Sequence, residues 1–278
     1  MANNINNLFS LSGKVVVITG AVGLLGVRHA EAVAAYGGTP VLLDLSQVAV
    51  DELSKKLNDK FNTNAVGFAV DITDESRVES VANDVVSQLG KIDGLVNNAA
   101  NNPKVENLSE TNFSRLESFP LDVWNQDIAV GLTGSYLCSK YFGFQISKNK
   151  NGGSIVNIAS DLGLIAPDQR LYAKKELAAH LQPVKPVTYS VIKAGLIGLT
   201  RYLSTYWVEQ NVRCNAICPG GIENGQSSDF LNEVSLRIPM DRLAKPNEYQ
   251  GTLVWMLSDA SSYLNGAIIP VDGGRTAW

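Results

Sequence analysis

The sequence has little of the chemistry that marks metal-binding or disulfide-stabilised proteins. Only three cysteines and two histidines occur among its 278 residues, which is too few for a structural zinc site. Cys214 and Cys218 lie four positions apart, but no second pair completes a set of four ligands. Three cysteines cannot all pair with one another, so reduced cysteines in the core and no bound metal are expected.

The chain also lacks long runs of one charge and long apolar runs. Its formal net charge of -4 is spread along the sequence, so there is no electrostatic footprint for nucleic acid or for an anionic membrane. The N-terminal stretch MANNINNLFSLSGK has no basic region, and the apolar run VVVIT is too short for a signal core or a membrane span. These features predict a cytoplasmic protein whose partner is a small molecule.

Seven short apolar runs alternate with longer helical patterns. They occupy residues 14–20, 39–46, 64–73, 92–100, 153–160, 212–221 and 267–274. They are apolar almost throughout, as strands buried on both faces should be. Helical patterns at 27–38, closed by glycine, and at 73–90, opened by Thr73 and Asp74 as caps, lie between them. We predict an α/β fold of the Rossmann type, a doubly wound parallel sheet of about seven strands flanked by helices.

No low-complexity linker and no internal repeat interrupts this pattern, so residues 1–278 are expected to form a single domain. In such sheets the ligand lies beyond the carboxyl ends of the strands, where the strand order reverses.

A glycine-rich turn follows the first predicted strand. Gly20, Gly23 and Gly26 stand where the chain enters the first helix, and there glycines let the backbone approach a pyrophosphate bound at the helix N-terminus. Asp44 ends the second strand, where a carboxylate accepts hydrogen bonds from ribose hydroxyls and repels a 2′-phosphate. Leu45 follows it, and no basic residue lies between positions 20 and 26, which favours NAD over NADP. The alternatives are that the glycines form only a packing turn and that Asp44 only caps the next helix.

Several motifs together resemble the short-chain dehydrogenase/reductase family. They are TGAVGLLG, VDIT, NNAA, YSVIK and CPGG, in the family's order and over nearly the whole chain. The resemblance implies cofactor contacts from Gly20, Gly23, Leu25, Gly26, Asp44, Leu45, Asp71, Ile72, Asn98, Ala99, Tyr189, Lys193, Pro219 and Ile222.

The glycine spacing departs from the usual pattern, because Leu24 stands where the middle glycine is expected. This spacing is closer to that of the extended branch of nucleotide-sugar epimerases and dehydratases. NNAA, the short C-terminal section and DGG ending at Gly274 are features of the shorter oxidoreductases. A finer resemblance, in NNAANNPK, IASDLGLIAPDQRLY and DGGRTAW, is to bacterial oxidoreductases associated with flagellin and lipopolysaccharide modification. It implies sugars or nucleotide-linked sugars as substrates.

Tyr189 and Lys193 lie four positions apart, one turn of the predicted helix. A phenol with its ordinary pKa of about 10 is a poor base at neutral pH, and a nearby ammonium lowers that pKa. Tyr189 can then exchange the proton of a substrate hydroxyl while hydride moves to or from the nicotinamide. Ser160, which ends a strand, sits where the family places a hydroxyl that orients the substrate oxygen. Taken alone, a tyrosine and a lysine four positions apart on a helix would be read as structural, and a serine at a strand end as bonded to the backbone; the surrounding motifs reverse this interpretation.

The distance from Ser160 to Tyr189 is longer than the family's, and Tyr172 competes for the catalytic role. Four positions after Tyr172 stands Glu176 rather than a lysine, so Tyr189 is preferred. The extra segment near residues 166–186 reads as an insertion beside the active site.

Basic and polar side chains of this insertion are candidate substrate ligands. Arg170, Lys174 and Lys175 could meet a phosphate or carboxylate, and Gln169 is a comparable polar candidate. A solvated charge cluster is the alternative, and His180 is expected on the surface of the same segment.

Two further positions depart from the family. Counting from Trp124, Gly131 stands where many members carry an asparagine whose backbone carbonyl holds a water for proton relay; glycine keeps a carbonyl. Asn224 stands where a threonine often contacts the nicotinamide amide.

We expect an NAD(H)-dependent oxidoreductase acting on a secondary alcohol or ketone of a sugar or nucleotide-linked sugar. The alternatives are a non-catalytic NAD-binding regulator and an epimerase or dehydratase with tightly bound NAD. By analogy with the family, a homodimer or homotetramer is expected. It would form through the helices around residues 122–145 and 189–207, unless Tyr206 and Trp207 fill the monomer's own core.

Overall fold

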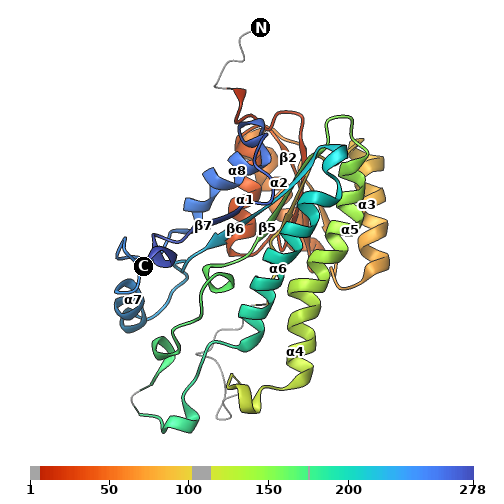
Figure 1. The fold of residues 1–278 in the computed structure, drawn as a ribbon. Helices are drawn as coiled ribbons and strands as arrows, with labels where there is room; N and C mark the ends of the chain where they lie inside the picture. The colour runs from red at the N-terminus through yellow and green to blue at the C-terminus, as the bar shows by residue number, and fades with distance from the viewer. Residues whose placement is uncertain (1–6, 102–113, 175) are drawn as a thin grey trace.

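The structure is a computed structural model that describes residues 7–101, 114–174 and 176–278. Its centre is one parallel sheet with the strand order β3-β2-β1-β4-β5-β6-β7 (Figure 1). The strands are β1 (Val15–Thr19), β2 (Thr39–Asp44), β3 (Val66–Ala69), β4 (Gly94–Asn97), β5 (Gly153–Ile158), β6 (Val212–Pro219) and β7 (Ile268–Val271). This confirms the seven predicted strands and the doubly wound α/β fold.

Helices cover both faces of the sheet (Figure 1). Those on one face are α1 (Leu24–Ala35), α2 (Gln47–Phe61) and α8 (Gln250–Leu257), whose apolar side chains share one core cluster with the sheet. Those on the other are α3 (Glu75–Leu89), α5 (Gly134–Ser147) and α6 (Val187–Tyr206). The helix α4 (Leu121–Ile128) leads into α5, and α7 (Ser228–Ser235) lies between β6 and β7 in the chain.

Short helices complete the described chain: η3 (Leu116–Ser118), the π-helical η4 (Ala129–Thr133), η5 (Asp161–Gly163), η6 (Gln169–Tyr172), η7 (Ala179–Leu181), η8 (Val208–Gln210), η9 (Pro246–Tyr249), η10 (Asp259–Ser261) and η11 (Arg275–Ala277).

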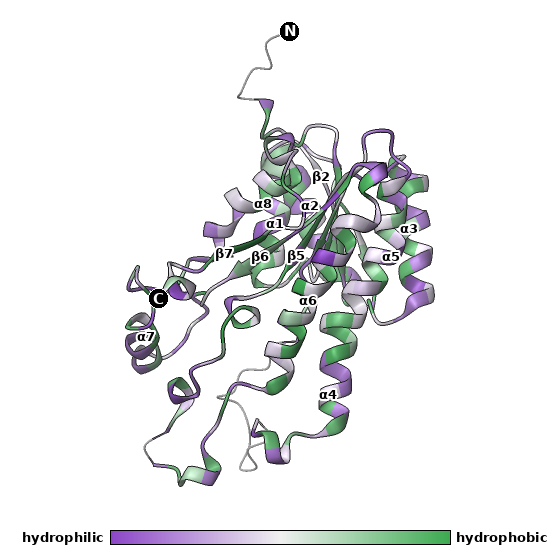
Figure 2. Cartoon of the chain, in the orientation of Figure 1, coloured by the Kyte–Doolittle hydropathy of each residue, from purple (hydrophilic) through white to green (hydrophobic). Residues whose placement is uncertain are grey.

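The inner strands are apolar and buried because helices cover them on both sides. Every residue of β1 and β4 is buried, whereas the edge strand β3 is only half-buried. Figure 2 shows the visible strands of the sheet mostly in green, the hydrophobic end of the scale, and purple, hydrophilic residues on α3. The strand order reverses between β1 and β4, so the cleft for a ligand is expected at their carboxyl ends.

One of the two predicted caps of α3 is confirmed. The Asp74 side chain accepts a hydrogen bond from the Arg77 N–H at 3.0 Å, and Gly90 ends the helix in the left-handed conformation. Thr73 does not cap the helix; its hydroxyl donates to Asp71 Oδ1 at 2.7 Å.

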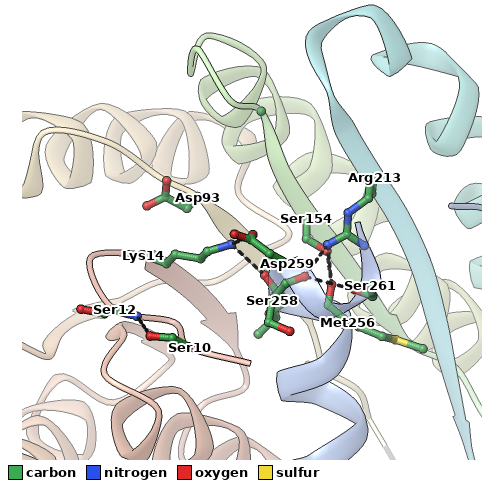
Figure 3. A network of polar contacts seen from close by, with 12 residues as sticks. Ser10, Ser12, Lys14, Asp93, Ser154, Arg213, Met256, Ser258, Asp259 and Ser261 are labelled. Atoms are coloured by element: carbon green, nitrogen blue, oxygen red, sulfur yellow. Dashed lines mark hydrogen bonds and ion pairs between the residues drawn. The ribbon is translucent and has the colours of Figure 1, made fainter. Parts of the chain in front are cut away.

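The amino ends of the strands are closed by a network of polar contacts (Figure 3). Arg213, in β6, donates to the carbonyls of Met256 and Ser258 at 2.9 and 3.2 Å. Ser154 in β5 donates to the same Met256 carbonyl at 2.8 Å, and Lys14 is paired with an aspartate of η10 at 2.7 Å. This network fixes the end of α8 to the sheet and leaves the carboxyl ends of the strands open.

Cys138, Cys214 and Cys218 are free and buried, as the sequence predicts. In the described segments no group of three or more histidine, cysteine or acidic side chains could hold a metal ion. None of the helices in the same segments is long and apolar enough to cross a membrane.

The aromatic residues at the end of α6 have different surroundings. Trp207 packs in the core against Gly143 of α5. Tyr206 is 59% exposed and stacks on Tyr202, itself 61% exposed. One of the two aromatics therefore fills the monomer's own core, and the predicted oligomer interface stays a prediction.

His29, in α1, is a buried histidine with an unusual environment. Its side chain is 1% exposed, and neither ring nitrogen has a hydrogen-bond partner among the described residues. Burial lowers its pKa from 6.5 to about 4. The unfolded chain therefore takes up a proton as the pH falls below 6.5, whereas the folded protein resists protonation until about pH 4.

We expect this histidine to make the protein less stable in mild acid. The pKa depression corresponds to about 3 kcal/mol of unfolding free energy, lost as the pH falls from 6.5 towards 4. Urea unfolding at several pH values should show this loss in the wild type and not in His29→Leu. His180→Gln, which changes an exposed histidine, is the matched control. If the free energy of unfolding depended on pH in the same way in His29→Leu and the wild type, His29 would not be the cause of the acid sensitivity.

Candidate active site

A cleft of about 640 Å³ opens at the carboxyl ends of the central strands. It is lined by most of the predicted cofactor residues, namely Gly20, Gly23, Leu25, Asp44, Leu45, Asp71, Ile72, Asn98, Ala99, Tyr189, Lys193, Pro219 and Ile222. Gly26 is not among the lining residues described; it lies behind the turn, against Gly20. The structure therefore brings together residues from the ends of β1, β2, β3, β4 and β6 and from α6.

The glycine turn fits an anionic group. Gly20 has a φ of +61°, and a Cβ there would lie 2.9 Å from the Cα of Ala99, so only glycine suits this position. Gly23 precedes α1, and among the described residues no side chain caps that helix or places an acidic group in its first turn. The partial positive charge at the start of α1 thus faces the cleft, as a pyrophosphate requires.

Asn98 holds the turn in place from the neighbouring strand end. Its Nδ2 donates to the carbonyls of Thr19 and Gly20 at 2.9 and 3.1 Å. The Thr19 hydroxyl in turn accepts from the N–H groups of Asn98 and Ala99, each at 3.0 Å. The NNAA motif therefore rigidifies the floor of the cleft.

Asp44 lies at the end of β2 beside the glycine turn. Its Oδ2 accepts from the Val22 N–H at 3.0 Å and its Oδ1 from the Leu45 N–H at 2.8 Å. It does not cap the following helix, whose N-cap is Ser46. This excludes the helix-cap alternative and leaves a carboxylate at the rim of the cleft.

Tyr189 and Lys193 lie on one face of α6, at the cleft. The Lys193 Nζ donates to the Ile158 carbonyl at 2.8 Å and lies 5.7 Å from the centre of the Tyr189 ring. Ser160 follows β5; it is buried, and its hydroxyl lies near enough to Tyr189 to lower the pKa of the phenol. The three predicted catalytic side chains are thus neighbours.

Burial dominates the ionisation of this group. Burial raises the pKa of Tyr189, the hydrogen bond with Ser160 lowers it, and the charge of Asp161 raises it. Burial also lowers the pKa of Lys193 to about 8, with a contribution from Lys185. We expected Lys193 to lower the pKa of Tyr189, but in the protein alone its ammonium is directed at a carbonyl and burial prevails.

Lys185 is a cation near Tyr189 that the sequence analysis did not single out. Its Nζ lies 3.9 Å from the centre of the Tyr189 ring, closer than that of Lys193. Burial lowers the pKa of Lys185 to about 8, and Asp161 opposes this shift. A signal was present in the sequence, since Lys185 stands four positions before Tyr189, on the segment that leads into α6.

Gly131 lies in the π-helical turn between α4 and α5 and is buried. Its carbonyl accepts from the Ser135 hydroxyl at 3.1 Å. A Cβ at this position would lie 2.7 Å from Cγ2 of Ile192. An asparagine would therefore collide with α6 unless Ile192 moved, which explains why glycine stands here.

The candidate substrate residues of the 166–186 segment are engaged with the protein. Arg170 is paired with Asp168 at 2.8 Å, and its side chain is 84% exposed. The Gln169 Oε1 accepts from the Lys185 N–H at 2.8 Å. Neither is among the lining residues described for the cleft. Lys175 lies outside the described residues, as do residues 102–104 of the NNAANNPK motif.

The rest of this segment shows how it is anchored. Tyr172 lies near Phe230, with ring centres 6.2 Å apart, and burial raises its pKa to about 12. The Lys174 N–H donates to Gln182 at 2.7 Å, and His180 is exposed as expected. Asn224 lines the cleft, and so does Gln126 of α4, which the sequence did not indicate.

Comparison with known proteins shows which family the chain is similar to. Residues 20–276 match the family model described as enoyl-(acyl carrier protein) reductase. The chain is 34% identical to the NADP-dependent mannitol dehydrogenase of Hypocrea jecorina, over 99% of this chain and 97% of that protein.

Two crystal structures resemble it. A short-chain type dehydrogenase/reductase from Mycobacterium marinum has a TM-score of 0.84 at 25% identity, covering 99% of this chain and all of that one. An NAD+-bound xylitol dehydrogenase has a TM-score of 0.81 at 26% identity, covering 95% of this chain and 99% of that one. The chain therefore belongs to the short-chain dehydrogenase/reductase family.

Proposed function

We propose that this protein is an NAD(H)-dependent oxidoreductase that transfers a hydride between the nicotinamide and a secondary alcohol or ketone of a polyol or sugar. The observation that carries this proposal is the meeting of the glycine turn, Asp44, Tyr189 and Lys193 in one cleft. When bound, the dinucleotide supplies or accepts the hydride. The relatives whose names specify mannitol and xylitol support a polyol. A sugar linked to a nucleotide, as in glycan modification, is the narrower form of this proposal.

The chain's own groups would handle the proton. With its pKa raised by burial, Tyr189 is a neutral phenol at pH 7 and can donate a proton to a developing alkoxide. Lys193, with a pKa of about 8, is mostly cationic at that pH and would bind ribose hydroxyls and favour the phenolate in the reverse direction. Ser160 would orient the substrate oxygen through its hydroxyl.

The charge at the rim of the cleft supports NAD over NADP. Asp44 places a carboxylate beside the expected ribose, and among the described lining residues Lys193 is the one basic side chain. A 2′-phosphate near Asp44 would be repelled with no nearby guanidinium to offset it. The relatives differ on this point, since one is named as NADP-dependent and another was crystallised with NAD+.

We expect NADH to bind at least about ten times more tightly than NADPH, because loss of a charge-assisted hydrogen bond costs about 1.5 kcal/mol or more. Asp44→Ser should weaken NADH binding by about tenfold and so reduce the preference for NADH over NADPH. Cofactor fluorescence and the shift in melting temperature measure both effects.

Asp84→Ser, an equal charge change on the exposed face of α3, is the matched control and should bind NADH like the wild type. Equal affinity for the two cofactors would refute the assigned role of Asp44. Absence of binding by either would refute the proposed function itself.

Turnover is tested by incubating the protein with NAD+ and mannitol or xylitol and following NADH formation. Cofactor binding without turnover of any polyol or sugar would favour the non-catalytic regulator. We propose in addition that residues 1–278 act as one cofactor-binding domain and assemble as a dimer or tetramer, which light scattering of the purified protein would test.

A further inference from the structure

Asp161 is a buried carboxylate directly beside the candidate catalytic serine. Its side chain is 4% exposed. The Ser160 hydroxyl donates to its Oδ1 at 2.8 Å, and the Leu162 N–H donates to the same oxygen at 2.8 Å. A serine hydroxyl has one hydrogen to donate. The Ser160 Oγ also accepts from the Leu162 N–H at 3.2 Å. Asp161 and this N–H together fix the direction of the Ser160 hydroxyl beside Tyr189.

Arg275 brings the opposite charge to Asp161 from the C-terminal turn. Its Nη1 lies 3.1 Å from Asp161 Oδ2, and its side chain is 11% exposed. The contact lacks hydrogen-bond geometry, because Oδ2 has no hydrogen-bond partner among the described residues. The two side chains thus interact as an ion pair and not through a directional hydrogen bond. A buried carboxylate without such a partner would be strongly destabilising.

The turn that carries Arg275 is itself fixed. The Asp272 side chain accepts from the N–H of Gly274 at 2.9 Å and from that of Thr276 at 2.8 Å. Gly273 and Gly274 both have positive φ, at +67° and +90°. The end of β7 therefore holds the guanidinium against the end of β5.

Ionisable groups from many elements lie around Tyr189 and Asp161. They are Asp161 at η5, Tyr172 in η6, Lys185 before α6, Lys193 in α6, Tyr249 in η9, and Arg275 and Asp272 after β7, with Cys218 of β6 near Lys193 and Asp127 of α4 bonded to Thr188. Of these, Asp161 is the group bonded to Ser160 and, through it, connected to the Tyr189 hydroxyl.

We propose that Asp161 and Arg275 are positioning residues for the reaction at Tyr189, a role that rests on the proposed function. Asp161 fixes the orientation of the Ser160 hydroxyl beside Tyr189, and Arg275 balances the negative charge that Asp161 places beside the phenol. The directions of the charge effects agree with this. Burial raises the pKa of both Tyr189 and Asp161; the charge of Asp161 raises the pKa of Tyr189 further, and Arg275 opposes the rise at Asp161. The last residues of the chain thereby influence proton transfer.

The effect of the Asp161 and Arg275 charges on Tyr189 is tested by titration of the NAD+-loaded protein. The ultraviolet absorbance of the phenolate is followed, and the absorbance of the matching Tyr189→Phe protein is subtracted to isolate the Tyr189 signal. Asp161→Asn keeps the acceptor oxygen and removes the charge, so the titration should move down by about one pH unit. Arg275→Met should move it up by a similar amount, and the double variant should return close to the wild type. Arg275→Lys keeps the charge and should behave like the wild type.

The positioning role is tested by comparing Asp161→Ala with Asp161→Asn in polyol oxidation. The alanine variant lacks the acceptor and should lower kcat by about tenfold relative to the asparagine variant, with little change in KM. In a Ser160→Ala background this difference should disappear. Melting temperature and NADH binding identify variants that fail to fold, in which case the lysine and methionine variants of Arg275 decide the matter.

An unchanged titration in Arg275→Met and Asp161→Asn, or a difference between the Asp161 variants that persists without the Ser160 hydroxyl, would overturn the proposal. The two failures are distinguishable. A shifted titration in a protein that oxidises no polyol would leave the charge effect standing and refute the proposed function. A protein that oxidises polyols but whose Tyr189 titration does not shift in the variants would support the proposed function and refute the charge effect.

Discussion

Replacement of Tyr189 by phenylalanine is expected to reduce the rate of polyol oxidation by about 10³-fold or more, because the phenol is the group positioned to exchange the substrate proton. Phenylalanine keeps the ring that packs between Lys185 and Lys193, whose Nζ atoms lie 3.9 and 5.7 Å from its centre. Only the hydroxyl and its interaction with Ser160 are lost. Steady-state kinetics should therefore show the loss in kcat, while NADH affinity and melting temperature remain close to the wild type.

Tyr172 provides the matched control, because it is the rival tyrosine in the sequence. It lies near Phe230, with its pKa raised to about 12. Tyr172→Phe should retain activity within about threefold, since surface and packing changes away from the reacting atoms have small effects. If Tyr172→Phe were inactive and Tyr189→Phe active, the roles assigned to the two residues would have to be exchanged.

The sheet was predictable because its strands are buried on both sides and therefore read as continuous apolar runs. The run VVVIT became β1 with every residue buried. The helix α3 was equally predictable from its cap at Asp74 and its left-handed Gly90. In both cases the information is local, since it lies within the element and its first and last turns.

The π-helical turn at Ala129–Thr133 could not be predicted, because its cause is packing against another helix. Gly131 and Gly195 lie where the π-helical turn η4 and α6 approach each other; a Cβ on Gly131 would meet Ile192, and one on Gly195 would meet Leu132. Close approach of this kind depends on which helices become neighbours. The sequence of one helix does not contain that information.

The candidate site also has a part that the sequence could predict and a part that it could not. The cofactor cleft was predictable because parallel strands place their carboxyl ends at one edge, so residues that follow the strands meet there. The partnership of Asp161 with Arg275 was not, since it joins the end of β5 to a turn after β7. Arg170 could not be assigned from the sequence either. Its charge suggested a ligand for the substrate, but in the fold it forms an ion pair with Asp168.

Replacement of Gly26 by alanine is expected to lower the free energy of unfolding by about 4 kcal/mol, because backbone atoms occupy the space of a side chain. A Cβ at Gly26 would lie 2.1 Å from the Gly20 carbonyl oxygen and 2.8 Å from the Cα of Ala21. Neither atom can turn aside as a side chain could, so the turn must open. Since the same turn presents the start of α1 to the cleft, NADH affinity should fall with stability.

Gly251→Ala distinguishes this steric effect from the ordinary replacement of a helical glycine. Gly251 is exposed in α8, and a Cβ there meets no atom within 4 Å. Its substitution should stabilise the protein, by no more than about 1 kcal/mol. Urea unfolding and NADH fluorescence on both variants would measure the contrast. If Gly26→Ala unfolded like Gly251→Ala and bound NADH normally, the tight turn would not be what shapes the cofactor cleft, and Leu24 in place of the family's middle glycine would become the feature to test.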